Sequence, residues 1–101
     1  MRVEIDKFME NVFDSKHEDY EVSRKWLISL LESSPVEVTF IKRDGTERIM
    51  KCTLQEEYLP ETVGDIRKKN EDALAVYDLD MKDWRSFRWD SIKRINFTIG
   101  E

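Results

Sequence analysis

The sequence predicts an α+β domain in which two short N-terminal helices precede a small β-barrel of five strands. Before residue 34 the apolar residues repeat with helical spacing, whereas after Pro35 they alternate with the period of two that is typical of strands. The chain has 101 residues, 40% of them hydrophobic and 11% aromatic, which is enough for one modest core. We therefore expect an N-terminal helical segment, residues 1–34, and a barrel domain, residues 35–101.

The first predicted helix depends on a short apolar stripe made of Phe8, Val12 and Phe13. A polar stretch, residues 14–19, interrupts this stripe, and the second helix begins near Asp19, because aspartate favours the N-cap position. The apolar face of the second helix is formed by Trp26, Leu27, Leu30 and Leu31. This helix ends before Pro35, since the residue that precedes a proline disfavours the α conformation.

Five strands are predicted at residues 36–40, 47–55, 73–77, 84–89 and 92–99. The first two form a hairpin, because Asp44-Gly45 between alternating runs is a strong turn signal. Residues 56–71 are polar and predict a long loop. The predicted core consists of Val38, Phe40, Met50, Cys52, Leu54, Val76, Phe87, Trp89, Ile95 and Phe97. Closing these strands into a barrel removes exposed sheet edges.

The charge balance is acidic, with 17 basic against 22 acidic residues and a formal net charge of −5. Such a chain is a poor general coat for DNA, because phosphate binding depends on neutralising cations. No apolar run approaches the roughly 18 residues of a membrane helix, and the acidic start lacks the apolar core of a secretory signal. A lone cysteine fits a reducing compartment. We expect a cytoplasmic protein with no membrane partner.

The residues that carry catalytic chemistry are few. His17 is the only histidine and lies in a polar stretch, and Cys52 alternates with core residues, so neither predicts a nucleophilic or zinc site. Asp78, Asp80 and Asp83 are spaced like the start of a calcium loop, but the glycine and glutamate of such a loop are missing, which favours a turn of solvated acids. We therefore expect no enzyme activity, no metal and no cofactor.

An aromatic and basic strand, residues 84–89, offers a binding site instead. Alternation places Phe87 and Trp89 in the core and puts Trp84, Ser86 and Arg88 on the other face, with Arg85 opposite them at the barrel rim. The hairpin adds the basic residues Lys42, Arg43, Arg48 and Lys51. Together these side chains are suited to stacking bases and holding phosphates. The alternative is structural: Trp84 packs under the 56–71 loop and the arginines pair with neighbouring acids.

The same segment carries a family resemblance. The motif W-R-S-F-R-W-D-S-I, residues 84–92, follows L-A-V-Y-D-L-D, residues 74–80, and resembles the end of a WYL-type domain. Residues 36–97 as a whole resemble a small WYL-like family of tailed phages, described as an Sm-like small β-barrel. The resemblance implies a nucleic-acid or nucleotide-like ligand, with Arg85, Arg88 and Tyr77 as the candidate binding residues. Unlike WYL-type regulators, this chain lacks a complete helix-turn-helix domain.

Two functions follow as hypotheses. In the first, the protein is a non-enzymatic phage accessory or regulatory protein of the host cytoplasm, whose barrel binds single-stranded RNA or DNA or a nucleotide-like ligand. In the second, the barrel is a scaffold and the acidic N-terminal segment, with Glu18, Asp19 and Glu21 as the first candidates, binds and modulates a host protein. The acidic net charge supports the second hypothesis, and the basic strand supports the first.

Overall fold

The computed structural model describes residues 2–6, 11–59 and 72–98, and the structural statements below concern these ranges. The secondary structure elements are, in chain order, β1 (Arg2–Asp6), α1 (Tyr20–Ser33), β2 (Val36–Ile41), β3 (Glu47–Thr53), a 3-10 turn η1 (Glu56–Tyr58), β4 (Ala73–Asp78), β5 (Asp83–Arg88), a 3-10 turn η2 (Trp89–Ser91) and β6 (Ile92–Thr98). The fold class is α+β, as predicted, with one α-helix in the described ranges.

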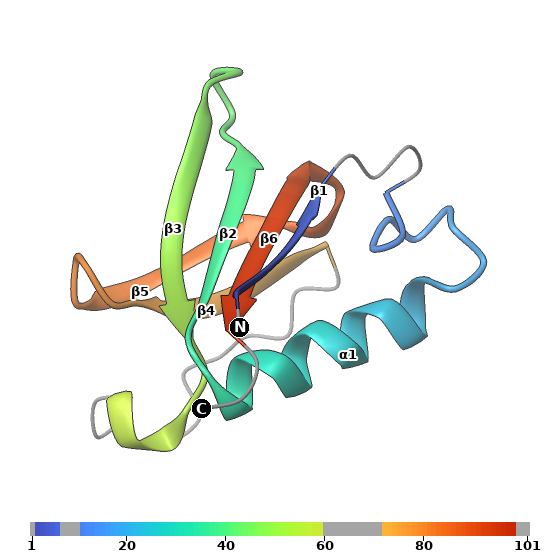
Figure 1. Ribbon diagram of the computed structural model, residues 1–101. Helices are drawn as coiled ribbons and strands as arrows, with labels where there is room; N and C mark the ends of the chain where they lie inside the picture. The colour runs from blue at the N-terminus through green and yellow to red at the C-terminus, as the bar shows by residue number, and fades with distance from the viewer. Residues whose placement is uncertain (1, 7–10, 60–71, 99–101) are drawn as a thin grey trace.

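The six strands form one antiparallel sheet in the order β1-β6-β2-β3-β4-β5. The sheet curls, so that the β4–β5 hairpin crosses behind the β2–β3 hairpin while α1 runs below them (Figure 1). A register shift between Thr39 and Phe40, where β2 pairs with β6, supplies part of the bend, because bulges increase local twist. The prediction of five strands is wrong by one, since β1 adds a sixth.

The predicted first helix is also wrong. Residues 2–6 form a strand that pairs with β6, with Val3 opposite Phe97 and Ile5 opposite Ile95. Residues 11–19 form turns, held in part by the amide of Asp14 donating to the carbonyl of residue 11 at 3.0 Å. Phe8, on which the predicted helix depended, lies outside the described residues, as do Ile99 and residues 60–71 of the predicted loop.

The β2–β3 hairpin turns where the sequence predicts. Gly45 has φ of 91°, in the left-handed region that glycine occupies without steric cost, and the Lys42 amide donates to the Thr46 carbonyl at 2.7 Å. The hydroxyl and the amide of Thr46 donate to Asp44 Oδ1 at 2.7 and 3.0 Å. These bonds lower the pKa of the Asp44 carboxyl below its usual value and hold the turn that carries Lys42 and Arg43.

The core lies between the inner face of the sheet and α1. All ten predicted core residues are buried, and Leu27 and Leu31 of α1 join them. The carbonyl of Leu31 accepts hydrogen bonds from the Thr53 hydroxyl at 3.0 Å and from the Leu54 amide at 2.9 Å. Because the last carbonyls of a helix need partners outside it, these bonds fix the end of α1 to the end of β3.

An aromatic cluster attaches the segment before α1 to the barrel. Phe13 stacks on Trp89 with ring centroids 5.7 Å apart, and the Asn11 amide donates to the Trp89 carbonyl at 2.9 Å. The Arg24 guanidinium lies over the rings of Tyr20 and Trp89, at 4.8 and 5.1 Å, and donates to the Phe13 carbonyl at 2.7 Å. Trp89 is thus the point where the N-terminal segment, α1 and the sheet meet. In the described ranges, no helix is both long and apolar enough to cross a membrane.

Candidate nucleic-acid interface

A basic pocket lies between the outer half of the β2–β3 hairpin and β5, with a volume of about 550 Å³. We define the basic pocket by its basic residues, Lys42, Arg43, Arg48, Arg85 and Arg88, and by its apolar floor, Phe40, Met50 and Phe87. Ile41, Ala73 and Ser86 complete the lining that the structure describes, and no acidic residue belongs to it. The volume falls within the range typical of small-molecule sites.

Strand alternation explains why cations surround an apolar floor. On β3, Arg48 and Met50 point to the same face, so Arg48 lies beyond the last core residue of its strand. On β5, Arg85 and Phe87 share a face in the same way, whereas Arg88, three residues after Arg85, lies on the other face of the strand. The floor rings of Phe40 and Phe87 lie 5.6 Å apart, centroid to centroid, with their planes inclined by 32°. The pocket therefore forms where the curled sheet opens at the end of its core.

Arg48 is held by a buried carboxylate. Its guanidinium donates to Asp78 Oδ2 at 2.9 Å, and the Asp78 side chain is only 2% exposed. The other oxygen, Asp78 Oδ1, accepts from the amides of Asp80 and Met81 at 3.0 and 3.1 Å. Three donors thus fix this carboxylate, which fixes Arg48 in turn. The prediction that Asp78 belongs to a turn of solvated acids is wrong, because Asp78 continues the inward face of β4 after Val76.

Two rim arginines pair with exposed acids. Arg85 donates to Asp83 at 3.1 Å, and Arg88 makes a two-pronged contact with Asp90 at 3.1 and 3.0 Å. The hydrogen bonds and charge of Asp90 raise the pKa of Arg88 above its usual value. All four side chains are at least 38% exposed, so water screens these pairs and a competing anion can displace the acids.

The remaining two cations have no such partner. Lys42 and Arg43 are exposed in the hairpin turn, and neither makes an ion pair with any residue that the structure describes. The basic pocket therefore combines one fixed arginine, Arg48, one arginine held by a displaceable acid, Arg85, and two cations that make no ion pair with the described residues, Lys42 and Arg43.

Comparison with known proteins identifies the family. The chain matches the family model described as WYL_2, Sm-like SH3 beta-barrel fold, over residues 24–93, which is more than half of its length. The chain belongs to the WYL_2 family. An Enterobacteria phage T4 protein, described as "Uncharacterized 11.5 kDa protein in Gp31-cd intergenic region", is 31% identical over 78 residues, which cover 72% of this chain and 76% of the phage protein. No solved structure matches the chain.

The predicted resemblance to a phage WYL-like family with an Sm-like barrel is thus confirmed. The match begins inside α1 and does not test the predicted domain boundary between residues 34 and 35, which stays a prediction. Within the WYL_2 match lie both segments that form the basic pocket, the β2–β3 hairpin and β5.

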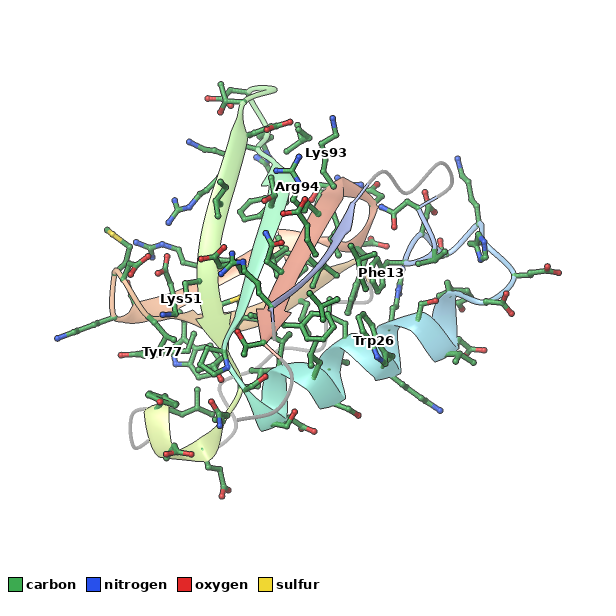
Figure 2. All side chains as sticks on the ribbon, in the orientation of Figure 1. Phe13, Trp26, Lys51, Tyr77, Lys93 and Arg94 are labelled. Atoms are coloured by element: carbon green, nitrogen blue, oxygen red, sulfur yellow. The ribbon has the colours of Figure 1, made fainter. Side chains whose placement is uncertain are left out.

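The structure brings together five of the eight predicted binding residues, those that line the basic pocket. The other three, Lys51, Trp84 and Tyr77, do not line it. Lys51, labelled in Figure 2, is an exposed residue of β3. It lies on the opposite face of β3 from Arg48, because residues three apart on a strand point to opposite sides. Trp84 and Tyr77 meet edge to face, 5.9 Å apart, on the outer face of β4 and β5. The predicted convergence of Trp84 and Lys51 with the hairpin cations is therefore wrong.

Arg85, by contrast, lies closer to the site than the sequence predicts. The sequence places it opposite Trp84 and limits it to the rim, whereas this face is the one that opens into the basic pocket. The residue that sequence reasoning missed is Asp78, whose alternation with Val76 on β4 was the available signal.

The other singled-out residues lie away from the basic pocket. Cys52 is fully buried, and burial together with the nearby Asp78 charge raises the pKa of its thiol to about 12, which suits a core residue. The acids Glu18, Asp19 and Glu21 are exposed around the start of α1. Asp19 occupies the N-cap position as predicted, without a capping hydrogen bond from its side chain.

Proposed function

We propose that the basic pocket binds single-stranded nucleic acid or a nucleotide, and that the protein is a non-enzymatic phage accessory or regulatory protein. The observation that carries this proposal is the lining of the pocket, where five basic residues accompany an apolar floor and no acid is among the described lining residues. The acids that pair with Arg48, Arg85 and Arg88 lie outside this lining. Cations beside an apolar surface suit a ligand that joins phosphates to flat bases.

The composition of the whole chain makes this local arrangement informative. The protein carries a net charge of −5, so a generally basic surface does not explain the cluster. Lys42 and Arg43 make no ion pair in the described ranges, although the charge of Lys42 helps to lower the pKa of the neighbouring Asp44 carboxyl. The field of a concave site concentrates anions near such cations. The proposed ligand therefore meets the pocket through the hairpin turn first.

The test is fluorescence anisotropy with a labelled single-stranded oligonucleotide, titrated at several salt concentrations. We expect binding by the wild type to weaken steeply with salt, because each neutralised phosphate of a single strand contributes about 0.7 to the slope of log K against log salt. Lys42→Gln and Arg43→Gln are each expected to weaken binding and to reduce this slope by about 0.7.

Lys51→Gln is the matched control, because it makes the same charge change on the same hairpin but on the opposite face of β3. It should change affinity and slope far less than Lys42→Gln does. Binding without salt dependence, or equal effects of Lys42→Gln and Lys51→Gln, would show that the ligand does not bind at the basic pocket. Absence of binding to RNA, DNA and nucleotides alike would overturn the proposed function.

A further inference from the structure

Five of the thirteen basic residues in the described ranges line the basic pocket, and this grouping restricts the kind of ligand. A groove that binds the backbone of a long single strand has cations along its whole path. Outside the basic pocket, the nearby described cations do not extend such a path. Lys93 is paired with Glu47 at 3.7 Å, and Lys51 lies on the opposite face of β3. The positive charge of the basic pocket therefore suits a ligand with one compact anionic group.

A rim carboxylate restricts the ligand further. Arg85, which shares the pocket face of β5 with Phe87, is already satisfied by Asp83, so an incoming anion must compete with this carboxylate for its guanidinium. A phosphodiester carries a single charge, as a carboxylate does, and gains little from this exchange. A terminal phosphate carries about −1.5 to −2 at neutral pH and has three acceptor oxygens, so it competes better.

Resting on the proposed function, we propose that the basic pocket binds the terminal phosphate of a nucleoside 5′-phosphate, either as a free nucleotide or as the 5′ end of a single strand. The phosphate contacts the fixed guanidinium of Arg48 together with Lys42 and Arg43, and displaces Asp83 from Arg85. The nucleoside lies against the apolar part of the lining, beside Phe40 and Phe87, which are 8% and 3% exposed. Internal phosphodiesters bind more weakly.

The experiment compares matched ligands on the full chain. A 3′-labelled single strand is titrated with either a 5′-phosphate or a 5′-hydroxyl end, and unlabelled nucleoside, nucleoside 5′-monophosphate and inorganic phosphate serve as competitors. We expect the 5′-phosphate strand to bind about tenfold more tightly, the effect of about one added charge-assisted hydrogen bond. We expect the nucleotide to compete better than both the nucleoside and inorganic phosphate.

The outcomes separate this inference from the proposed function. Equal, salt-sensitive binding of the two strands would overturn the terminal-phosphate inference and leave the proposed function standing, whereas no binding of any strand or nucleotide would overturn both. Inorganic phosphate competing as well as the nucleotide would overturn the assignment of a nucleoside to the apolar floor. Preference for the 5′-phosphate strand without competition by the nucleotide would identify the strand end as the source of the phosphate.

A substitution at the rim gives an independent readout. Asp83→Asn removes the carboxylate that competes for Arg85, so the 5′-hydroxyl strand should bind about two- to fivefold more tightly and the preference for the 5′-phosphate should shrink. Asp80→Asn is the matched control, since Asp80 is exposed and its side chain makes no ion pair within the described ranges. If Asp83→Asn and Asp80→Asn change the preference equally, Asp83 does not compete with the phosphate.

Discussion

Replacing Asp78 by asparagine tests whether one buried carboxylate holds the inner wall of the basic pocket. Asparagine keeps the shape of the side chain, and its carbonyl oxygen still accepts from the amides of Asp80 and Met81. Its amide group cannot accept from Arg48, so the 2.9 Å contact with the guanidinium is replaced by two opposed donors. The lost interaction is one hydrogen bond between charged groups, in which the Asp78 side chain is 2% exposed and the Arg48 side chain 35% exposed.

A hydrogen bond of this kind stabilises a fold by about 1.5–3 kcal/mol, so we take about 2 kcal/mol for Asp78→Asn. At about 4–8 °C per kcal/mol for a domain of this size, the midpoint of thermal unfolding should fall by about 8–16 °C. Circular dichroism on heating measures this midpoint, and urea titration gives the free energy of unfolding independently.

Asp80→Asn is the control for the thermal experiment, because it makes the same chemical change in the same turn on an exposed side chain. It should change the free energy of unfolding by less than about 0.5 kcal/mol, as surface substitutions usually do. If Asp78→Asn unfolds within a degree or two of wild type, the Arg48–Asp78 pair does not hold the pocket wall, and the fixed position assigned to Arg48 is wrong.

Three further predictions concern residues outside the basic pocket. Trp89→Ala should cost about 3–5 kcal/mol, because Trp89 joins the N-terminal segment to the core, and a variant that unfolds near the wild-type midpoint would contradict this role. The Cys52 thiol should react with a disulfide reagent at pH 8 far more slowly in the native than in the unfolded protein. Because folding raises its pKa from 9.0 to about 12, the contribution of this thiol to the free energy of unfolding should be intact below pH 9 and decline toward pH 12. Cys52→Ala should lack this part of the decline. Trp84→Ala should leave oligonucleotide affinity within about twofold of wild type, because Trp84 packs against Tyr77 on the other face of the sheet, and a large loss of affinity would restore the outer face as the binding site.

Local patterns were sufficient to predict most strands. Alternation and the Asp44-Gly45 turn predict the β2–β3 hairpin, and its observed bounds differ from the predicted ones by one or two residues. The strand β1 was missed although Val3 and Ile5 alternate with polar residues. Its partner β6 lies more than 80 residues away along the chain, so no local signal indicates the pairing.

The site was only partly predictable for a related reason. The sequence marks the hairpin and β5 as basic, but a strand of basic residues has two faces. Spacing alone shows that Arg48 and Lys51 point to opposite sides, whereas the curl of the sheet decides which side opens into a pocket. The pair between Arg48 and Asp78 joins residues 30 positions apart, and it depends on the pairing of β3 with β4.

The central claim is that ligand binds at the basic pocket and at no other surface, and amide chemical-shift mapping tests it most directly. The isotope-labelled full chain is titrated with a 5′-phosphorylated single strand, and the shift of each backbone amide is followed. We predict the largest shifts in residues 40–50 and 85–88, with Lys42 and Arg43 among them and little change at the start of α1. Largest shifts at Glu18, Asp19 and Glu21, or changes confined to the outer face around Tyr77 and Trp84, would contradict the claim.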